Sequence, residues 1–188
     1  IIVDETERLN SIVTKILTPP KKPKLGLFNI HSALEKVFAL SQVDKDNLLI
    51  LKRDYDPSIP EINGDEDLFI QAILNIVKNA QQALLHTSNP IITIKSRISY
   101  NQPINGNLHA TVCEVSVIDN GPGIPSDIQE QVFFPMVSSK QDGSGLGLSI
   151  SQDIIRIHGG SISFSTKSGE TVFSIVIPIK LGSGVKSA

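Results

Sequence analysis

The sequence predicts an α+β fold: a two-layer α/β sandwich in which a mixed β-sheet carries helices on one face, preceded by one amphipathic helix. Composition is the first reason, because 40% of the 188 residues are hydrophobic and 19% are charged. These values suit a soluble folded domain and exclude a disordered chain or a membrane protein. Periodicity is the second reason, because helical and strand-like segments both occur and bury their apolar faces by packing in layers.

Charge and cysteine content narrow the classes of function. A net charge of −2 makes a dedicated nucleic-acid surface unexpected. Cys113 is the single cysteine, which excludes an internal disulfide or a cysteine-based zinc site and favours a reducing compartment, so we expect a cytoplasmic protein. There is no apolar run long enough to span a membrane and no export signal. Because the chain starts at Ile1 without a methionine, we interpret it as a fragment of a longer protein.

Residues 1–18 place apolar side chains at helical spacing between charged ones, which predicts an amphipathic helix. Pro19 and Pro20 end this helix. Residues 19–25 form a linker rich in proline and lysine. We therefore expect three units, the helix 1–18, the linker 19–25 and a domain over 26–188.

In the first part of this domain, the sequence pattern predicts two helices and a strand. A helix is expected over 30–40, capped by Asn29 or by Ser32, of which Ser32 stands in capping-box spacing with Glu35. An apolar strand is expected at 48–51. Acidic residues at 65–67 then open a long helix that runs to about residue 85, since carboxylates complement the dipole at a helix N-terminus.

The second part predicts two pairs of strands around one helix. Strands are expected at 91–98 and 112–118, separated by an Asn- and Gly-rich stretch at 101–107. After a glycine-punctuated segment, a helix is expected from Leu148 to the Gly159-Gly160 pair. The last two strands, 161–165 and 172–179, are joined by a turn at 167–169.

The long helix carries a polar stripe that is a candidate binding face. At 100° per residue, one side collects five polar side chains, namely Gln71, Asn75, Lys78, Asn79 and Gln82. An amide oxygen is a hard ligand that suits Mg²⁺ when phosphates and water complete its coordination shell. The alternative is a merely solvated face, although Glu and Lys usually fill such a face in preference to Asn.

The segment 119–125, Asp-Asn-Gly-Pro-Gly-Ile-Pro, directly follows a predicted strand. Gly121 and Gly123 allow positive φ angles or a close approach of a ligand to the backbone. An ionised Asp119 can accept a hydrogen bond from a donor such as the exocyclic amine of adenine. A tight structural turn is the alternative. A dinucleotide fingerprint is excluded, because prolines interrupt it and no helix starts at the third glycine.

A second glycine-rich segment, 143–148, reads Gly-Ser-Gly-Leu-Gly-Leu and opens the next helix. Backbone N–H groups at a helix N-terminus form an anion site when glycines leave them accessible. The segment is not a P-loop, since no Gly-Lys-Ser or Gly-Lys-Thr occurs in it. It is not a Rossmann site either, since it follows a loop and not a strand.

Taken in this order, the segments resemble the ATP-binding catalytic domain of two-component sensor histidine kinases, within the gyrase, Hsp90, histidine kinase and MutL superfamily (GHKL). Residues 75–80 match the N box, and 119–125 and 143–148 match the two glycine boxes. Phe-Phe-Pro at 133–135 stands where the F box belongs. The resemblance implies the Bergerat-type ATP-binding fold of that superfamily.

The resemblance also implies a role for each matching residue. Asn79 would bind Mg²⁺ through the nucleotide, Asn75 and Lys78 would contact the phosphates of ATP, and Asp119 would bind the adenine amine. Asn75 and Asn79 are thereby the expected catalytic residues. Residues 133–142 would form a lid over the nucleotide. The remaining implied nucleotide contacts are Gly121, Gly123, Lys140, Gly143, Ser144, Gly145, Leu146 and Gly147.

Residues 53–57, 75–80 and 134–139 resemble in particular the nitrogen-regulation sensor kinases of NtrB type. This implies a protein-histidine kinase that phosphorylates a histidine upstream of this fragment. The implied partners are an NtrC-type response regulator, a PII signal protein and, in the full-length protein, a second copy of the same chain. Residues 1–18 would then be the end of the second helix of the dimerisation and phosphoacceptor bundle.

Two features depart from the family pattern, and two rival functions stay open. The phosphoaccepting histidine box is absent, and Met136 and Val137 replace the paired aromatic residues of the F box. The histidines that are present have no metal-ligand spacing, and we expect them to be structural. One rival is an ATP-hydrolysing clamp of the gyrase or MutL kind, which uses a glutamate where this chain has Asn75. The other is a nucleotide-sensing scaffold that binds ATP or ADP and transfers nothing.

Overall fold

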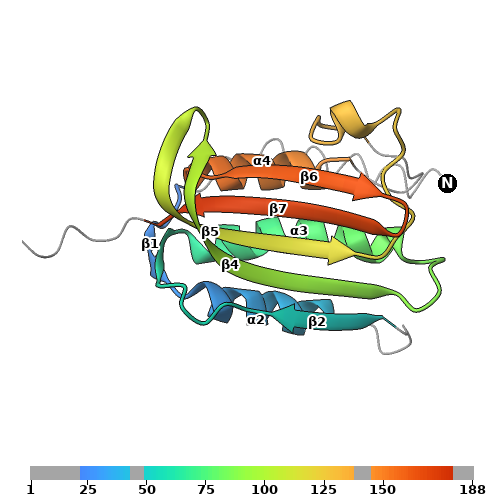
Figure 1. Ribbon diagram of the computed structural model, residues 1–188, viewed down its shortest axis with the longest axis horizontal. Coiled ribbons are helices and arrows are strands. Elements are labelled where there is room, and N and C mark those ends of the chain that lie inside the picture. Colours follow the sequence, from blue (N-terminus) through green and yellow to red (C-terminus); the bar gives the residue numbers. More distant parts are fainter. Residues whose placement is uncertain (1–21, 43–48, 138–144, 180–188) are drawn as a thin grey trace, which may run out of the picture.

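The computed structural model describes residues 22–42, 49–137 and 145–179, and it has the predicted two-layer architecture. Within these ranges, five strands form one sheet in the order β2-β4-β5-β7-β6, and three helices cover one of its faces (Figure 1). The strands are β2 Ile50–Asp54, β4 Ile91–Ile104, β5 Asn107–Asp119, β6 Ser161–Lys167 and β7 Glu170–Pro178. The helices are α2 Ile30–Ser41, α3 Glu66–Ala83 and α4 Gly147–Ile157, with a short 3-10 turn, η1, at Gln129–Gln131. The predicted helix 1–18 lies outside the described residues.

The sheet is mixed, as predicted. β2 runs parallel to β4, whereas β4 with β5, β5 with β7 and β6 with β7 are antiparallel. A parallel pair needs a long crossover connection, and here the chain passes through α3 between β2 and β4. This crossover places α3 against the sheet, where it can supply the core. None of the helices in the described ranges has the length and apolar character needed to cross a membrane.

The core lies between the helices α2, α3 and α4 and the inward face of the sheet, with α3 at its centre. Phe69 and Ile73 on α3 are fully buried (0% exposed), as are Ile94 on β4 and Val115 on β5. Burying each such side chain contributes about 1.5–3 kcal/mol to the free energy of folding. Cys113, on the same face of β5, is also fully buried, as predicted, and burial raises the pKa of its thiol to about 12.

The β4–β5 hairpin is longer than predicted. Its pairing continues to Ile104 and Asn107, so most of the stretch 101–107, expected as a separating loop, belongs to a two-stranded ribbon. Figure 1 shows this ribbon curving away from the other strands. At its tip Asn105 and Gly106 have φ angles of 50° and 82°. Two consecutive residues with positive φ are typical of a type I′ turn, whose twist matches that of the strands in a two-residue hairpin.

Other local predictions need correction. β2 spans Ile50–Asp54, later in the chain than the expected strand at 48–51. Asn29, and not Ser32, caps α2, because its side-chain oxygen accepts the N–H groups of His31 and Ser32 at 2.9 and 3.1 Å. A small antiparallel sheet of β1 (Gly26–Phe28) and β3 (Ile62–Gly64) was not predicted. Three residues are too few to show the alternation that identifies a strand.

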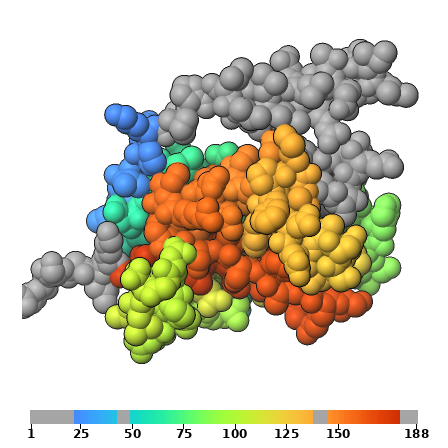
Figure 2. Space-filling view, turned by 90° about the horizontal axis from the view of Figure 1, so that it is seen from above, coloured from blue at the N-terminus to red at the C-terminus, as the bar shows by residue number. Residues whose placement is uncertain are grey.

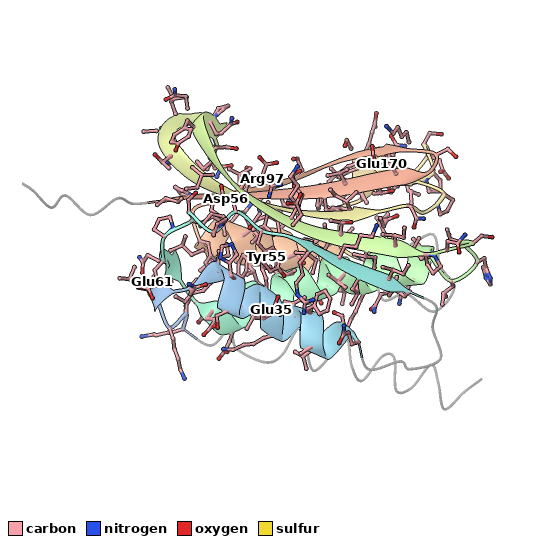
Figure 3. The ribbon with its side chains drawn as sticks, turned by 60° about the horizontal axis from the view of Figure 1, so that its bottom comes forward. Glu35, Tyr55, Asp56, Glu61, Arg97 and Glu170 are labelled. Atoms are coloured by element: carbon pink, nitrogen blue, oxygen red, sulfur yellow. The ribbon has the colours of Figure 1, made fainter. Side chains whose placement is uncertain are left out.

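On the side formed by α2 and β2, where Figure 3 labels Glu35 and Tyr55, an ion pair joins Glu35 of the helix to Arg53 of the strand. Nε of Arg53 donates to Oε1 of Glu35 at 2.7 Å, and the guanidinium lies 3.4 Å above the centre of the Phe38 ring. The hydrogen bond from Arg53 lowers the pKa of Glu35. Burial raises the pKa of Tyr55, which follows β2. The ion pair and the Arg53–Phe38 contact link α2 to the edge strand of the sheet, whereas its buried apolar residues pack it into the core.

Candidate functional site

The first contact of the site joins α3 to the start of α4. Nδ2 of Asn75 donates to the carbonyl oxygen of Gly147 at 3.2 Å. The hydroxyl of Ser151, which is completely buried (0% exposed), lies 3.0 Å from the same oxygen and 3.0 Å from the carbonyl oxygen of Ala72. These side-chain contacts hold together two predicted motifs that are 72 positions apart in the chain. Sequence reasoning did not identify Ser151, because a serine inside a helix gives no signal of its partner.

The polar stripe of α3 lies outside the core, as predicted. Lys78 is exposed and Asn75 and Asn79 are half-buried, whereas the apolar residues Ile76 and Val77 are fully buried. A carbonyl oxygen can only accept, so the bond to Gly147 fixes which way the Asn75 amide faces. Its oxygen Oδ1 then faces away from the Gly147 carbonyl. Gln71 and Gln82 are exposed on the same stripe.

Asp119 is the last residue of β5, and its side chain is buried (4% exposed) where the chain leaves the sheet. Oδ1 of Asp119 accepts the backbone N–H of Gly121 at 2.9 Å. The turn lies against the C-terminal end of α3, because a Cβ on Gly121 would be 3.6 Å from Cβ of Ala83. The structure therefore brings Asp119 and its turn to the helix that also carries Asn75.

The β6–β7 hairpin supports this turn from the other side. Gly169 N–H donates to the carbonyl oxygen of Gly121 at 3.0 Å, and Ile124 N–H donates to Oγ1 of Thr166 at 2.9 Å. Between these two bonds, Gly123 has a φ angle of +93°. The sequence did not reveal Thr166, since it lies 42 positions after Ile124 and meets it only when the sheet has formed.

The second glycine-rich segment is described from Gly145 onward. Gly145 has a φ angle of +63°, and a Cβ there would lie 2.5 Å from the carbonyl carbon of Met136, so a larger residue would force the backbone apart. Met136 N–H donates to the carbonyl oxygen of Gly145 at 3.0 Å. Leu146 is buried, and Gly147 begins α4. Figure 2 shows the amber surface around η1 lying beside the orange surface of α4.

Phe133 packs the expected F box against the core. Its ring lies 5.9 Å from the ring of Phe164 and 6.4 Å from that of Phe173, measured between centroids. The next residues of the predicted lid, 138–144, lie outside the described part of the chain. The lid over 133–142 thus stays a prediction, as do the nucleotide contacts expected from Lys140, Gly143 and Ser144.

The opposite end of α4 is tied to α3 through His158. Nε2 of His158 accepts the N–H of Asp65 at 3.0 Å, and Nδ1 donates to the carbonyl oxygen of Ile154 at 2.8 Å. Asp65 caps α3, and its carboxylate accepts the N–H groups of Leu68 at 3.1 Å and Lys24 at 2.6 Å. Burial raises the pKa of Asp65, but backbone hydrogen bonds from Leu68, Lys24 and Asp67, together with the nearby His158, outweigh it and hold the pKa below its usual value.

The donor set on α3 suits a magnesium ion that arrives with phosphates. Among the described residues, no group of three or more His, Cys, Asp or Glu side chains could hold a metal ion. The polar stripe instead offers the amide oxygens of Asn75 and Asn79, two side chains that are half-buried. Mg²⁺ is commonly bound by one or two protein oxygens, with phosphates and water as the other ligands. These residues therefore fit the ion that the sequence predicts.

Comparison with known proteins agrees with this geometry. Residues 64–181 match the family model described as histidine kinase-, DNA gyrase B- and HSP90-like ATPase. The sensory histidine kinase/phosphatase NtrB of Vibrio alginolyticus is 43% identical over 179 residues, which cover 95% of this chain and 51% of the relative. The chain thus spans about half the length of the curated relatives it matches.

Solved structures give the same family. The catalytic domain of the histidine kinase ThkA is 28% identical with a TM-score of 0.69, and the match covers 83% of this chain and 96% of that one. A structure of ThkA in complex with the response regulator protein TrrA is also 28% identical, with a TM-score of 0.73, and the match covers 95% of this chain and 49% of that one. The chain belongs to the histidine kinase-, DNA gyrase B- and HSP90-like ATPases, as an ATP-binding catalytic domain of the kind found in sensor histidine kinases such as NtrB.

Proposed function

We propose that this chain binds Mg·ATP between α3, the turn after Asp119 and the start of α4, and that it passes the γ-phosphoryl group to a histidine outside the chain. The observation that carries the proposal is the convergence of three motifs on one helix. Asn75 of α3 holds Gly147 at the start of α4, and the C-terminal end of α3 packs against Gly121. A nucleotide bound between these segments would have its base next to Asp119 and its phosphates next to the start of α4.

The base side of this site depends on Asp119. Its carboxylate is buried and accepts the N–H of Gly121. An ionised carboxylate can accept several hydrogen bonds, and an exocyclic amine is a suitable donor. Guanine presents an oxygen where adenine presents this amine, so Asp119 would favour adenine over guanine.

The phosphate side depends on α4 and the polar stripe. The first turn of α4 begins with Gly147 and contains no acidic residue, so its N–H groups and the positive end of its dipole suit an anion. Lys78 is exposed on the stripe and would add a positive charge. Mg²⁺ bound with the nucleotide would neutralise part of the phosphate charge, and Asn79 and Asn75 would orient it.

Phosphoryl transfer needs little covalent chemistry from the protein, because positioning and charge stabilisation supply most of the acceleration. Asn75 fits a kinase better than an ATP-hydrolysing clamp. An amide cannot take a proton from an attacking water, and a positioned general base contributes about 10²–10⁴-fold to such a reaction. ATP would therefore persist until a histidine is presented.

The partners follow from the resemblance to NtrB. We assign to the full-length protein an NtrC-type response regulator as the phosphate acceptor, a PII signal protein as regulator, a second copy of the chain and a location in the cytoplasm. The structure of ThkA with TrrA supports a response regulator as a partner of this class of kinase. The three units 1–18, 19–25 and 26–188 belong to the same proposal.

Titration calorimetry with the 188-residue chain tests the site. We expect Asn79→Ala to weaken the magnesium-dependent part of ADP binding, and Asp119→Asn to weaken ADP relative to GDP. Each effect should be roughly five- to 150-fold, because each change leaves a polar group of the complex unpaired at a cost of about 1–3 kcal/mol. Gln71→Ala is the matched control, since Gln71 is exposed on the same stripe two turns before Asn79.

Unchanged binding in both site variants would show that the assignment is wrong. Radiolabelled ATP then separates the kinase from its rivals. A kinase domain labels a separate polypeptide that supplies the acceptor histidine, and not itself. A scaffold labels neither, and a clamp releases phosphate steadily without an acceptor.

A further inference from the structure

We infer that Thr166 is a positioning residue for adenine recognition. Its hydroxyl holds the turn that follows Asp119 against the β6–β7 hairpin, so that the carboxylate and the turn present one fixed face to the base. This inference rests on the proposed function of Asp119. It concerns a residue on β6 that belongs to neither glycine box.

The turn from Gly121 to Ile124 is bonded to the hairpin at both of its ends. Gly169 N–H donates to the Gly121 carbonyl oxygen at 3.0 Å, and Ile124 N–H donates to Oγ1 of Thr166 at 2.9 Å. The first bond joins two backbone groups and survives most substitutions. The second bond depends on one side chain, so Thr166 can be changed without touching the turn itself.

The fit between the turn and the hairpin is close. A Cβ on Gly123 would lie 3.1 Å from Oγ1 of Thr166 and 3.1 Å from the carbonyl oxygen of Lys167. Both distances are shorter than ordinary van der Waals contact, so Gly123 lets the two backbones approach. The Thr166 hydroxyl therefore lies directly against the turn, within hydrogen-bond distance of the Ile124 N–H.

Thr166 also connects the turn to the strand beside Asp119. Its Oγ1 lies 3.2 Å from Oγ1 of Thr171, which is buried (4% exposed) on β7. Thr171 is the cross-strand neighbour of Asp119 in the β5–β7 register. A hydroxyl can accept one hydrogen bond while it donates another. A continuous path then leads from the Ile124 amide through both hydroxyls to the strand position opposite the base-binding carboxylate.

Loss of the Thr166 hydroxyl should loosen the turn without altering Asp119 or any phosphate contact. The effect should appear in the discrimination between bases. For Thr166→Val we expect the affinity for Mg·ADP to fall about three- to tenfold, as for the loss of one hydrogen bond. The affinity for Mg·GDP should change little, so the ratio of the two affinities narrows.

The test is calorimetry with Mg·ADP and Mg·GDP on four proteins: wild type, Thr166→Val, Thr166→Ser and Thr111→Val. Thr166→Ser keeps the hydroxyl and should keep the ADP preference. Thr111→Val makes the same chemical change on β5, eight positions before Asp119, and should also keep this preference. If Thr166→Val does not fold, Thr166→Ala removes the same hydroxyl and takes its place.

Asp119→Asn separates failure of this inference from failure of the proposed function. If Asp119→Asn narrows the ADP preference and Thr166→Val only lowers the melting temperature, Thr166 is structural and the inference is overturned. If Asp119→Asn leaves the preference unchanged, the base assignment itself is wrong and the inference falls with it. The inference is supported if the preference for Mg·ADP over Mg·GDP narrows in Thr166→Val and Asp119→Asn but not in Thr166→Ser or Thr111→Val.

Discussion

The N-termini of α3 and α4 differ in how they are completed. At α3, the side chain of Asp65 caps the helix, and Glu66 and Asp67 stand in its first turn. At α4, the cap position is occupied by Leu146, whose side chain cannot accept a hydrogen bond from the helix N–H groups. The first turn contains no acidic residue. Both helices pack on the same face of the sheet, so the difference arises from the sequence at their ends.

The comparison separates a structural helix end from a binding one. The carboxylates at α3 complement the dipole and satisfy exposed N–H groups from within the chain. At α4 no carboxylate of the first turn would compete with, or repel, an anion at that end. A chain that needs one phosphate site should keep acidic side chains away from that helix end and cap the others.

The largest effect should come from Gly145→Ala, which acts on the α4 end. A Cβ at Gly145 would meet the Met136 backbone, and the φ angle of +63° is itself unfavourable for alanine. We expect nucleotide affinity to fall more than tenfold in calorimetry. Gly106→Ala is the control, because Gly106 has a similar φ angle of +82° but open space around it. Equal affinities for all three proteins would contradict a phosphate role for this segment.

An intermediate effect is expected at the α3 end. Asp65→Ala should lower the free energy of unfolding by about 0.5–2 kcal/mol at pH 7, as for the loss of a cap, and leave nucleotide affinity unchanged. Urea unfolding and calorimetry measure the two quantities. A large loss of affinity would mean that the two helix ends are not separate in function.

The pH dependence of this effect follows from the lowered pKa of Asp65. A carboxyl group with a lowered folded-state pKa stabilises the fold above its unfolded pKa of about 3.9. This contribution disappears as the pH falls through the folded-state pKa. The stability difference between wild type and Asp65→Asn should therefore shrink below about pH 4. For Asn29→Ala, at the neutral cap of α2, no such dependence is expected from the cap residue.

The smallest effect is expected when the α4 end is made to resemble the α3 end. Ser149 lies in the first turn of α4 and is half-buried. Ser149→Glu should weaken ATP binding roughly two- to fivefold relative to Ser149→Gln. A carboxylate there would offset part of the positive end of the helix dipole and repel the phosphates, and a charge at a helix end is worth about 0.3–1 kcal/mol. The difference should shrink at high salt. Identical affinities in low salt would place the anion elsewhere.

Much of the fold was predictable, because the long elements repeat their pattern. The alternation of polar and apolar stripes predicted both the position of α3 in the chain and the face that it buries. The extension of β4 and β5 was missed although Asn105-Gly106 is a strong hairpin signal, since Pro103 and polar neighbours hide the alternation of the ribbon. The short strands β1 and β3 depend on each other for pairing and carry no pattern of their own.

The residues of the site that belong to sequence motifs were predictable, whereas the residues that hold these motifs in position were not. Asn75, Asp119 and the glycines were found because their residue types and order are distinctive. Thr166 and Ser151 were not, because their partners lie 42 and 79 positions away in the chain. Such contacts depend on strand register and helix packing, which a single sequence does not show.

The burial of Cys113 makes the chain suitable for site-specific labelling. It is the only cysteine in the sequence, and the raised pKa of its thiol leaves almost no thiolate at neutral pH. Since the thiolate is the reactive form, a maleimide dye added to the folded chain should leave Cys113 unmodified. A cysteine introduced at the exposed Ser168, in the turn that supports the Asp119 segment, would then carry the dye alone. Its fluorescence would report movement of this hairpin without any other change to the protein.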